Sequence, residues 1–289
     1  MLVERACIVG VGLLGGSLAL ALRNKGLARQ CVGTARTATT LKKALEMGVV
    51  DEAYPEAERA VGDCDLVVMC TPIGAIAALA SRIAPVLSKG ALLTDVGSTK
   101  RQVVEVIEPL EGRFRFVGGH PLAGSEKTGV AHAREDLFEN RTYFLTPTER
   151  SDLAAVGRMR DLVLGIGARP VMLSPDQHDR LVAITSHLPH VLACLTVALV
   201  RDEGLTRQQL EQGIGQGFLD VTRVAAGGAE MWTDILLTNA DHVDSLLQRV
   251  AQAAEEVRLQ VRKGAREQVL RWLEEAAQFR RSLGNQDDD

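Results

Sequence analysis

The sequence predicts an α/β protein in which a doubly wound, mainly parallel sheet is followed by an all-helical region. Two observations carry this prediction. Short β-rich runs alternate with segments of helical periodicity through the first half of the chain, and no convincing strand follows Asp176. Such alternation is typical of parallel strands joined by crossover helices. At Ser174-Pro175 the pattern changes from alternating strands and helices to helices alone. This change predicts two domains, residues 1–173 and residues 174–289.

The expected strands are short apolar runs, and the expected helices repeat apolar residues three and four positions apart. The strands are Ala6–Val9, Cys31–Thr34, Leu66–Cys70, Ala91–Asp95, Arg115–Val117, Tyr143–Thr146 and Ala168–Leu173. The helices between them are Leu13–Asn24, Leu41–Met47, Ile73–Leu87, Lys100–Leu110 and about Asp152–Leu164. The later helices are about Asp176–Asp202, Arg207–Gly213, Met231–Thr238, Asp241–Lys263 and a last one to about Arg281.

The long helix that begins the second domain has a distinctive sequence. Ser174 or Asp176 can cap its start, and Pro189 is expected to kink or break it. Its apolar stripe is wide and consists of Leu181, Ile184, Leu188, Val191, Leu195 and Ala198. Because helical domains often bury such faces against a second copy of the chain, we expect a homodimer.

The composition is that of a soluble globular protein, with 46% hydrophobic and 24% charged residues in 289. A net charge of −4 offers no basic field for a nucleic-acid backbone, so nucleic-acid binding is not expected. None of the five cysteines forms a C-x-x-C pair, which is typical of a reducing compartment. The apolar run Ala6–Leu22 resembles a signal peptide or a membrane span, but its glycines favour a strand, a tight turn and a buried helix. We therefore expect a cytoplasmic protein without a membrane segment.

A glycine-rich turn follows the first predicted strand. In a strand–turn–helix unit, Gly10 permits the tight turn, Gly12 lets the backbone approach a pyrophosphate, and Gly15 allows close packing of the helix. The helix start, with Leu13 and Leu14, supplies unpaired N–H groups to the phosphates. The pattern predicts a dinucleotide site; a flavin, S-adenosylmethionine or no ligand are the alternatives.

The end of the second strand bears on which dinucleotide fits. NAD-binding proteins usually carry Asp or Glu about 20 residues past the glycines, where this chain has Ala35. Arg36 offers a guanidinium, and Thr37 or Thr40 a hydroxyl, to a 2′-phosphate. Thr71 and Pro72, at the end of the third predicted strand, are expected to touch the cofactor. The sequence therefore predicts NADP, with NAD as the alternative.

Two further motifs follow predicted strands and carry candidate chemistry. Asp95-Val96-Gly97-Ser98-Thr99-Lys100 ends one strand, at the sheet edge where ligands of such folds bind. The run Gly118-Gly119-His120-Pro121 follows the end of the next strand and is expected to belong to a glycine-rich loop that carries one histidine. Oxidation of an alcohol needs a group that accepts the hydroxyl proton, and the near-neutral pKa of histidine suits His120 to that task.

In combination these motifs resemble the prephenate/arogenate dehydrogenase family of tyrosine biosynthesis. The matching motifs are GxGLxGGS at Gly10–Ser17, D-x-GS-x-K at Asp95–Lys100, GGHPxAG-S-E at Gly118–Glu126, S-H-L-P-H at Ser186–His190 and D-x-T-R at Asp220–Arg223. The resemblance implies a Rossmann domain followed by a helical dimerisation domain. It also implies an oxidative decarboxylation of prephenate or arogenate, with hydride transfer from ring C4 to the nicotinamide.

The resemblance also implies roles for single residues. His120 would remove the proton of the C4 hydroxyl, and Ser98 would orient that hydroxyl and His120. Arg223 would pair with a substrate carboxylate, while Ser186 and His190 would contact the substrate side chain. Ser125 and Glu126, just past the histidine, are expected to close the pocket.

Two alternative functions fit the sequence less well. A β-hydroxyacid dehydrogenase of the same build would need a catalytic lysine on the long helix, and Asp176–Asp202 contains no lysine. A non-catalytic NADP-sensing protein would not need His120, Ser98 and Arg223 to converge. No metal site is expected, because no carboxylate or cysteine completes a ligand set with His187 and His190; His187 is instead expected on the helix surface or as a cap.

Overall fold

The computed structural model describes residues 2–124 and 127–283. The contacts divide the chain into two compact units, Met1–Ala240 and Asp241–Asp289, which are described separately. The first unit holds the sheet together with the helices that follow it as far as residue 240. The division of the chain at residues 173 and 174 stays a prediction.

An eight-stranded sheet forms the centre of the first unit, in the order β3-β2-β1-β4-β5-β6-β7-β8. The strands are β1 Val3–Val9, β2 Ala28–Thr34, β3 Glu52–Tyr54, β4 Leu66–Met69, β5 Leu92–Asp95, β6 Arg115–Pro121, β7 Thr142–Thr146 and β8 Arg169–Met172. All neighbouring pairs are parallel except β6 with β7. The strand order reverses between β1 and β4, and ligands of doubly wound sheets bind at the carboxyl ends of strands at such a point.

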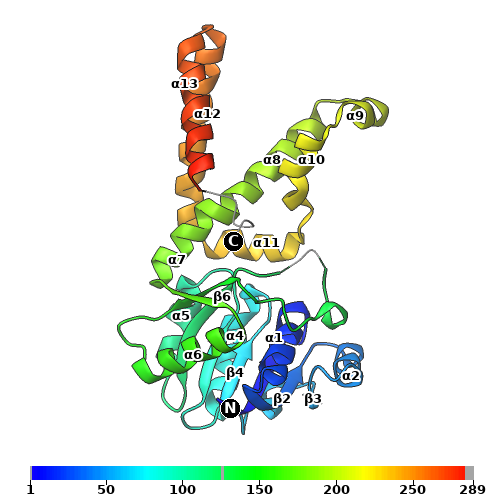
Figure 1. Cartoon of the computed structure of the whole chain (residues 1–289), viewed down its shortest axis with the longest axis vertical. Coiled ribbons are helices and arrows are strands. Elements are labelled where there is room, and N and C mark those ends of the chain that lie inside the picture. The colour runs from blue at the N-terminus through cyan, green and yellow to red at the C-terminus, as the bar shows by residue number, and fades with distance from the viewer. Residues whose placement is uncertain (1, 125–126, 284–289) are drawn as a thin grey trace. The chain divides into compact units, whose positions relative to one another are not determined.

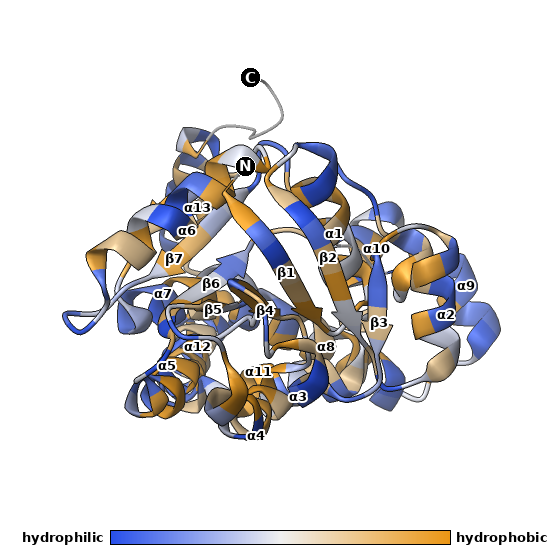
Figure 2. Ribbon diagram, turned by 90° about the horizontal axis from the view of Figure 1, so that it is seen from below, coloured by the Kyte–Doolittle hydropathy of each residue, from blue (hydrophilic) through white to orange (hydrophobic). Residues whose placement is uncertain are grey.

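Helices cover both faces of the sheet, so the predicted fold class is confirmed (Figure 1). They are α1 Leu13–Asn24, α2 Ala38–Glu46, α3 Ala57–Ala60, α4 Ile73–Ile83, α5 Arg101–Ile107 and α6 Leu153–Gly165. One apolar cluster includes residues of α1 and α6, and a second includes residues of α3, α4 and α5. Figure 2 shows the hydrophobic residues along the central strands and on α4 and α5.

The sequence located most of these elements and missed the short ones. β3 and α3, with three and four residues, are too short to show a periodicity. One prediction was wrong: the segment Gly118–Pro121, expected to belong to a glycine-rich loop, belongs to β6 and pairs with β7. A Cβ at Gly118 would lie 2.4 Å from Thr146 Oγ1, and one at Gly119 would lie 2.7 Å from the Asp95 carbonyl oxygen. The two glycines therefore permit close packing within the sheet rather than a turn.

Helices alone follow the sheet in the described part of the first unit. They are α7 Pro175–Val182, a π-helical segment Ala183–His187, α8 Leu188–Asp202, α9 Arg207–Gly213, α10 Gln216–Thr222, a 3₁₀ segment Arg223–Ala226 and α11 Ala229–Thr238. Ser174 caps α7, and its side chain and that of Gln177 form a capping box. The sequence predicted a kink or a break at Pro189, and of these two the break does not occur. The wide π-turn directly before it changes the hydrogen-bond spacing, so the N–H that proline lacks is accommodated.

The helical segment Pro175–Asp202 exposes an apolar face within the single chain. Leu181, Ile184 and Leu195 are 39%, 47% and 49% exposed. The segment has 28 residues, and an 18-residue stretch of it has a mean hydropathy of 1.7, so by length and composition alone it could cross a membrane. A helix whose apolar face packs against another chain passes the same test.

The second unit consists mainly of two helices. The helix α12 spans Ala240–Arg262 and α13 spans Arg266–Ser282, and Gly264 turns the chain between them with φ 64°. Both carry charged residues along one side, including the ion pair of Arg258 with Glu255.

Candidate active site

The glycine-rich turn between β1 and α1 has the geometry that its sequence predicts. Gly10 has φ +107°, and a Cβ there would lie 2.6 Å from the carbonyl oxygen of Cys70. A Cβ at Gly15 would lie 2.3 Å from the Gly10 carbonyl oxygen, so that glycine lets α1 approach the turn. A Cβ at Gly12 would meet no atom within 4 Å. Of these three glycines, Gly12 is the one that faces open space, as expected of a position where the backbone approaches a ligand.

A cavity of about 770 Å³ adjoins this turn. Seven of the ten residues predicted to hold the cofactor line it: Gly10, Gly12, Arg36, Thr37, Thr40, Thr71 and Pro72. Leu13, Leu14 and Gly15 are not among its lining residues. The helix α11 contributes Glu230 and Asp234, which were not predicted from the sequence, and Asp234 accepts a hydrogen bond from the Gly74 N–H.

The end of β2 forms one wall of this cavity. Thr37 caps α2 by accepting a hydrogen bond from the N–H of Thr40, and the two hydroxyls lie 2.8 Å apart. Arg36 is exposed and forms no ion pair with any described residue, whereas Arg82, also in the lining, is paired with Glu58. No carboxylate lies at Ala35. This wall therefore offers an unpaired guanidinium and two hydroxyls to a ligand.

A buried ion pair joins the next two strands. Asp95 at the end of β5 and Lys100 before α5 are both fully buried, and the Lys100 ammonium donates hydrogen bonds to the Asp95 carboxylate and to the Gly119 carbonyl oxygen. Asp95 also accepts hydrogen bonds from the N–H groups of Gly97 and Gly119. Burial lowers the pKa of Lys100, and Asp95 partly offsets that effect. The pair fixes the end of β6, which carries His120.

His120 is held in a chain of hydrogen bonds that begins on α7. Its Nδ1 lies 2.8 Å from Nε2 of His178, and Nδ1 of His178 lies 2.7 Å from Oδ1 of Asp179. Asp179 also accepts hydrogen bonds from the N–H groups of Lys100 and Arg101 at the start of α5. The ring of Phe144, opposite His120 on β7, packs edge-on against His178.

The pKa values in this cluster keep the histidines neutral and the carboxylate ionised. Burial, helped by His178, Lys100 and His187, holds the pKa of His120 well below its usual range. Burial also lowers the pKa of His178, although Asp179 opposes that shift. Burial alone would raise the pKa of Asp179, but the hydrogen bonds from His178 and from two backbone N–H groups outweigh it and lower that pKa.

The sequence did not predict the roles of His178 and Asp179. The contact between His120 and His178 joins residues 58 apart in the chain. Only the dipeptide His178-Asp179 at the start of a capped helix marks the position, and many helices begin with such residues. The partner predicted for His120 was Ser98, which forms no hydrogen bond with a described residue.

The other predicted substrate residues lie on the helical part of the unit. Arg223 is exposed, and no described residue forms an ion pair with it. Ser186 is exposed in the π-helical segment. Ser125 and Glu126 lie outside the described residues.

His190 and His187 pack around Trp232. The ring of His190 stacks on Trp232 with centroids 3.5 Å apart and planes 9° apart, and His190 is 4% exposed. His187 was expected on the helix surface or as a cap, but its side chain is buried. It is 1% exposed, and its Nδ1 lies 3.2 Å from Nδ2 of Asn239. Burial lowers the pKa of His187 to about 4. Among residues 2–124 and 127–283, no three metal-ligating side chains gather in one place.

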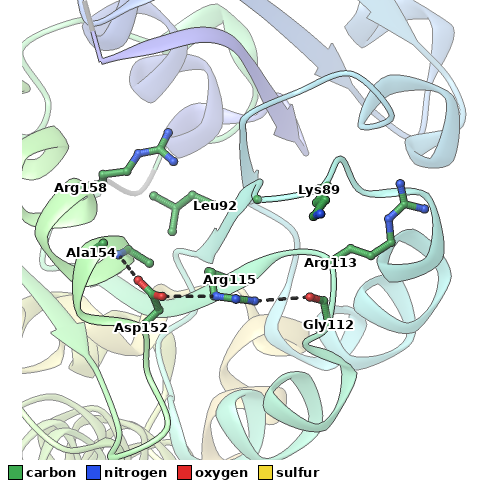
Figure 3. Close-up of a pocket in the computed structure, with 10 residues that line it drawn as sticks. Lys89, Leu92, Gly112, Arg113, Arg115, Asp152, Ala154 and Arg158 are labelled. Atoms are coloured by element: carbon green, nitrogen blue, oxygen red, sulfur yellow. Dashed lines mark hydrogen bonds and ion pairs between the residues drawn. The ribbon is translucent and has the colours of Figure 1, made fainter.

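A second cavity, of about 320 Å³, lies at the amino ends of β5 and β6 (Figure 3). Lys89, Arg113, Arg115 and Arg158 line it, and Arg115 pairs with Asp152 at 3.5 Å. Its side chains include no histidine or cysteine for proton transfer at neutral pH. The cavity beside the glycine turn and the His120 cluster are therefore the better candidates for the active site.

Comparison with known families agrees with this geometry. Residues 18–172 match the family described as prephenate dehydrogenase, nucleotide-binding domain, and residues 174–275 match the prephenate dehydrogenase dimerization domain. The chain belongs to the prephenate dehydrogenase family.

Relatives of known name cover nearly the whole chain. The prephenate dehydrogenase of Bacillus subtilis (strain 168) is 34% identical over 278 residues, which is 96% of this chain and 75% of that protein. The prephenate dehydrogenase from Aquifex aeolicus, solved with hydroxyphenyl propionate and NAD+, has a TM-score of 0.90 at 30% identity, covering 97% of this chain and 98% of that chain. Synechocystis arogenate dehydrogenase has a TM-score of 0.84 at 30% identity, covering 97% and 100%. These relatives include enzymes named for either of the two substrates.

Proposed function

We propose that the protein catalyses the oxidative decarboxylation of prephenate, arogenate or both in tyrosine biosynthesis, with a preference for NADP. The observation that carries the proposal is the placement of His120 at the end of β6, held by hydrogen bonds, on the same sheet whose strands β1, β2 and β4 border a cavity of about 770 Å³. Membership of the family supplies the class of reaction.

The chain's own residues meet the demands of this reaction. His120 is neutral at pH 7 because its pKa is lowered, so it is able to accept the proton of the substrate's C4 hydroxyl. Arg223, which has no described partner, is suited to bind one of the substrate carboxylates. Ser98 at the end of β5 is proposed to orient the C4 hydroxyl, and Ser186 and His190 to contact the side chain.

The reaction balances with one proton acceptor. The nicotinamide, when bound, supplies the hydride acceptor for C4. As the hydride leaves C4, the hydroxyl proton passes to His120. The bond between C1 and the ring carboxylate then breaks, CO₂ leaves, and the released electron pair completes the aromatic ring with a phenolate oxygen at C4. The phenolate takes the proton back from His120 and becomes the phenol, so His120 returns to its neutral form. Because aromatisation is favourable, positioning and proton acceptance are the main tasks left to the protein.

The preference for NADP rests on the wall at the end of β2. A 2′-phosphate would meet the unpaired Arg36 and the hydroxyls of Thr37 and Thr40, with no carboxylate at Ala35 to repel it. Open space at Gly12 leaves room for the pyrophosphate.

We further propose a cytoplasmic homodimer. The exposed apolar face of Pro175–Asp202 lies within the part that matches the family's dimerization domain. All five cysteines are free, which agrees with a reducing compartment.

Steady-state kinetics with two substrates and two cofactors test the proposal. Formation of reduced cofactor at 340 nm is followed with prephenate and with arogenate, each with NADP and with NAD. We expect turnover with at least one substrate and a lower KM for NADP than for NAD. No turnover in any of the four combinations would refute the reaction, and a clear preference for NAD would refute only the cofactor assignment.

A further inference from the structure

The hydrogen bonds around His120 determine which of its ring nitrogens carries the proton. Asp179 is ionised and therefore only accepts hydrogen bonds, so Nδ1 of His178 must donate to it across 2.7 Å. Nε2 of the neutral His178 then has a lone pair, and the 2.8 Å contact requires that Nδ1 of His120 donate. The proton of neutral His120 thus sits on Nδ1, and its Nε2 has the lone pair.

We propose that His178 and Asp179 are positioning residues for the base His120 in the reaction proposed above. They hold His120 in the tautomer whose Nε2 accepts the substrate's hydroxyl proton. When the O–H bond breaks and the Nε2–H bond forms, His120 becomes positively charged. The carboxylate of Asp179 balances that charge through His178, and no further proton has to move.

The surroundings leave Asp179 as the anion suited to this task. The positive charge of Lys100 acts on both His120 and His178, and Asp95, whose carboxylate is already engaged by that lysine, acts on His178. His187 lies nearby but is directed to Asn239. Asp179 is 1% exposed, and its two oxygens accept from the Lys100 and Arg101 N–H groups and from His178. The N–H groups at the start of α5 therefore hold the carboxylate in place and keep it ionised.

Substitutions at two residues, Asp179 and His178, test the proposal at different hydrogen bonds. Asp179→Asn removes the negative charge, and we expect kcat to fall roughly 10- to 100-fold with the substrate KM within about threefold. The acid limb of the pH profile of kcat/KM should also move to lower pH, because protonated His120 loses a compensating charge. His178→Gln keeps an acceptor for Nδ1 of His120 and should lower kcat less than His178→Phe, which removes the acceptor. Asp152→Asn, at the helix start of α6 beside the other cavity, is the matched control and should leave kcat unchanged.

Several outcomes would overturn the proposal. Unchanged kcat in Asp179→Asn and in both His178 variants would do so, as would a lower kcat with an unmoved acid limb, which indicates structural damage alone. If Asp179→Asn fails to fold, the rank order of the two His178 variants decides, because the described partners of the His178 ring nitrogens are the side chains of His120 and Asp179 and no backbone N–H.

A measurement without substrate separates this proposal from the proposed function. Nitrogen-15 NMR of the wild-type imidazoles at pH 7.5 should show His120 protonated at Nδ1 and bare at Nε2. The opposite tautomer would refute the proposal even if the enzyme is active. If neither substrate is turned over, the proposed function fails, and the NMR result still decides the hydrogen-bond chain.

Discussion

The two halves of the candidate site differ in how they are built. The cavity beside β1 and β2 is lined mainly by backbone, small residues and hydroxyls, and Gly12 and Arg36 are left without neighbours or ion-pair partners in the described chain. The cluster at β5, β6 and α7 consists of buried charged and polar side chains that engage one another. The first half is therefore suited to admit a ligand, and the second to hold reacting groups in fixed positions.

The substitution His120→Asn is expected to give the largest difference between the two halves, because it should impair catalysis and leave cofactor binding intact. Asparagine can still donate a hydrogen bond to His178, but it cannot accept the hydroxyl proton. We expect kcat to fall by roughly 10²- to 10⁴-fold, which is the usual contribution of a general base. NADP binding, measured by fluorescence titration of NADPH, should change little because the cavity lies on other strands. If the Kd for NADPH rose by the same factor as kcat fell, the two halves of the site would not act independently.

The cluster should also carry more of the stability than the cavity. Lys100→Met leaves the buried Asp95 carboxylate without its cation, and loss of one partner of a buried ion pair costs about 3–5 kcal/mol. Urea unfolding followed by circular dichroism measures the cost. Lys42→Met, which removes an exposed cation paired with Glu46, is the control and should change stability little. Equal effects of the two variants would contradict the account.

Substitutions at two glycines of the same turn are expected to affect different properties, stability at Gly10 and ligand binding at Gly12. Gly10→Ala forces a left-handed residue against the Cys70 carbonyl oxygen and should lower the unfolding free energy by about 2–4 kcal/mol. Gly12→Ala meets no atom within 4 Å, and as a helix-capping change it should cost less than about 1 kcal/mol. Gly12→Ala should instead raise the KM for NADP. If both variants lose the same stability, the space at Gly12 is not reserved for a ligand.

The wall at β2 should show a smaller and more selective effect. Arg36→Ser is expected to raise the KM for NADP about tenfold, which corresponds to about 1.4 kcal/mol, and to leave the KM for NAD unchanged. Arg29→Ser, on the same strand but paired with Glu4, is the control. Parallel changes in both KM values would show that Arg36 does not contact a 2′-phosphate.

A gradual loss of stability in acid is expected as well. His120, His178 and His187 have lowered pKa values in the folded protein, so their neutral forms are favoured by folding. Their contribution to the free energy of unfolding is fully present above pH 6.5, which is about the pKa of histidine in the unfolded chain. It is lost as the pH falls below that value, by at most about 1.4 kcal/mol per histidine and pH unit.

Urea midpoints at pH 7.0, 5.5 and 4.5 measure this slope. His187→Asn keeps an acceptor for Asn239 and should flatten the slope, whereas the exposed His132→Gln should not. An unchanged slope in His187→Asn would contradict the assigned shift.

The sequence predicted the cavity better than the cluster, for a physical reason. The glycine turn, the strand ends and the residues Arg36–Thr40 are local patterns whose backbone requirements are visible within a few residues. The pairing of His120 with His178 depends on how α7 packs against β6, which no local pattern specifies. The same holds for His187, whose burial against Trp232 and Asn239 comes from contacts distant in the chain.

Local rules also failed where the chain departs from regular geometry. Pro189 argued for a break, but one π-turn before it keeps the helix continuous. Gly118 and Gly119 argued for a loop, but close packing against Thr146 and Asp95 requires glycine within the strand. In each case a tertiary contact or a change of hydrogen-bond spacing outweighed the propensity of the residue.

In the proposed reaction one site couples oxidation to decarboxylation. The stoichiometry of the products tests this coupling most directly. With the accepted substrate and NADP, the account predicts one CO₂ released for each NADPH formed, with both products lost together in His120→Asn. Reduction of NADP without release of CO₂, or release of CO₂ without reduction, would contradict it.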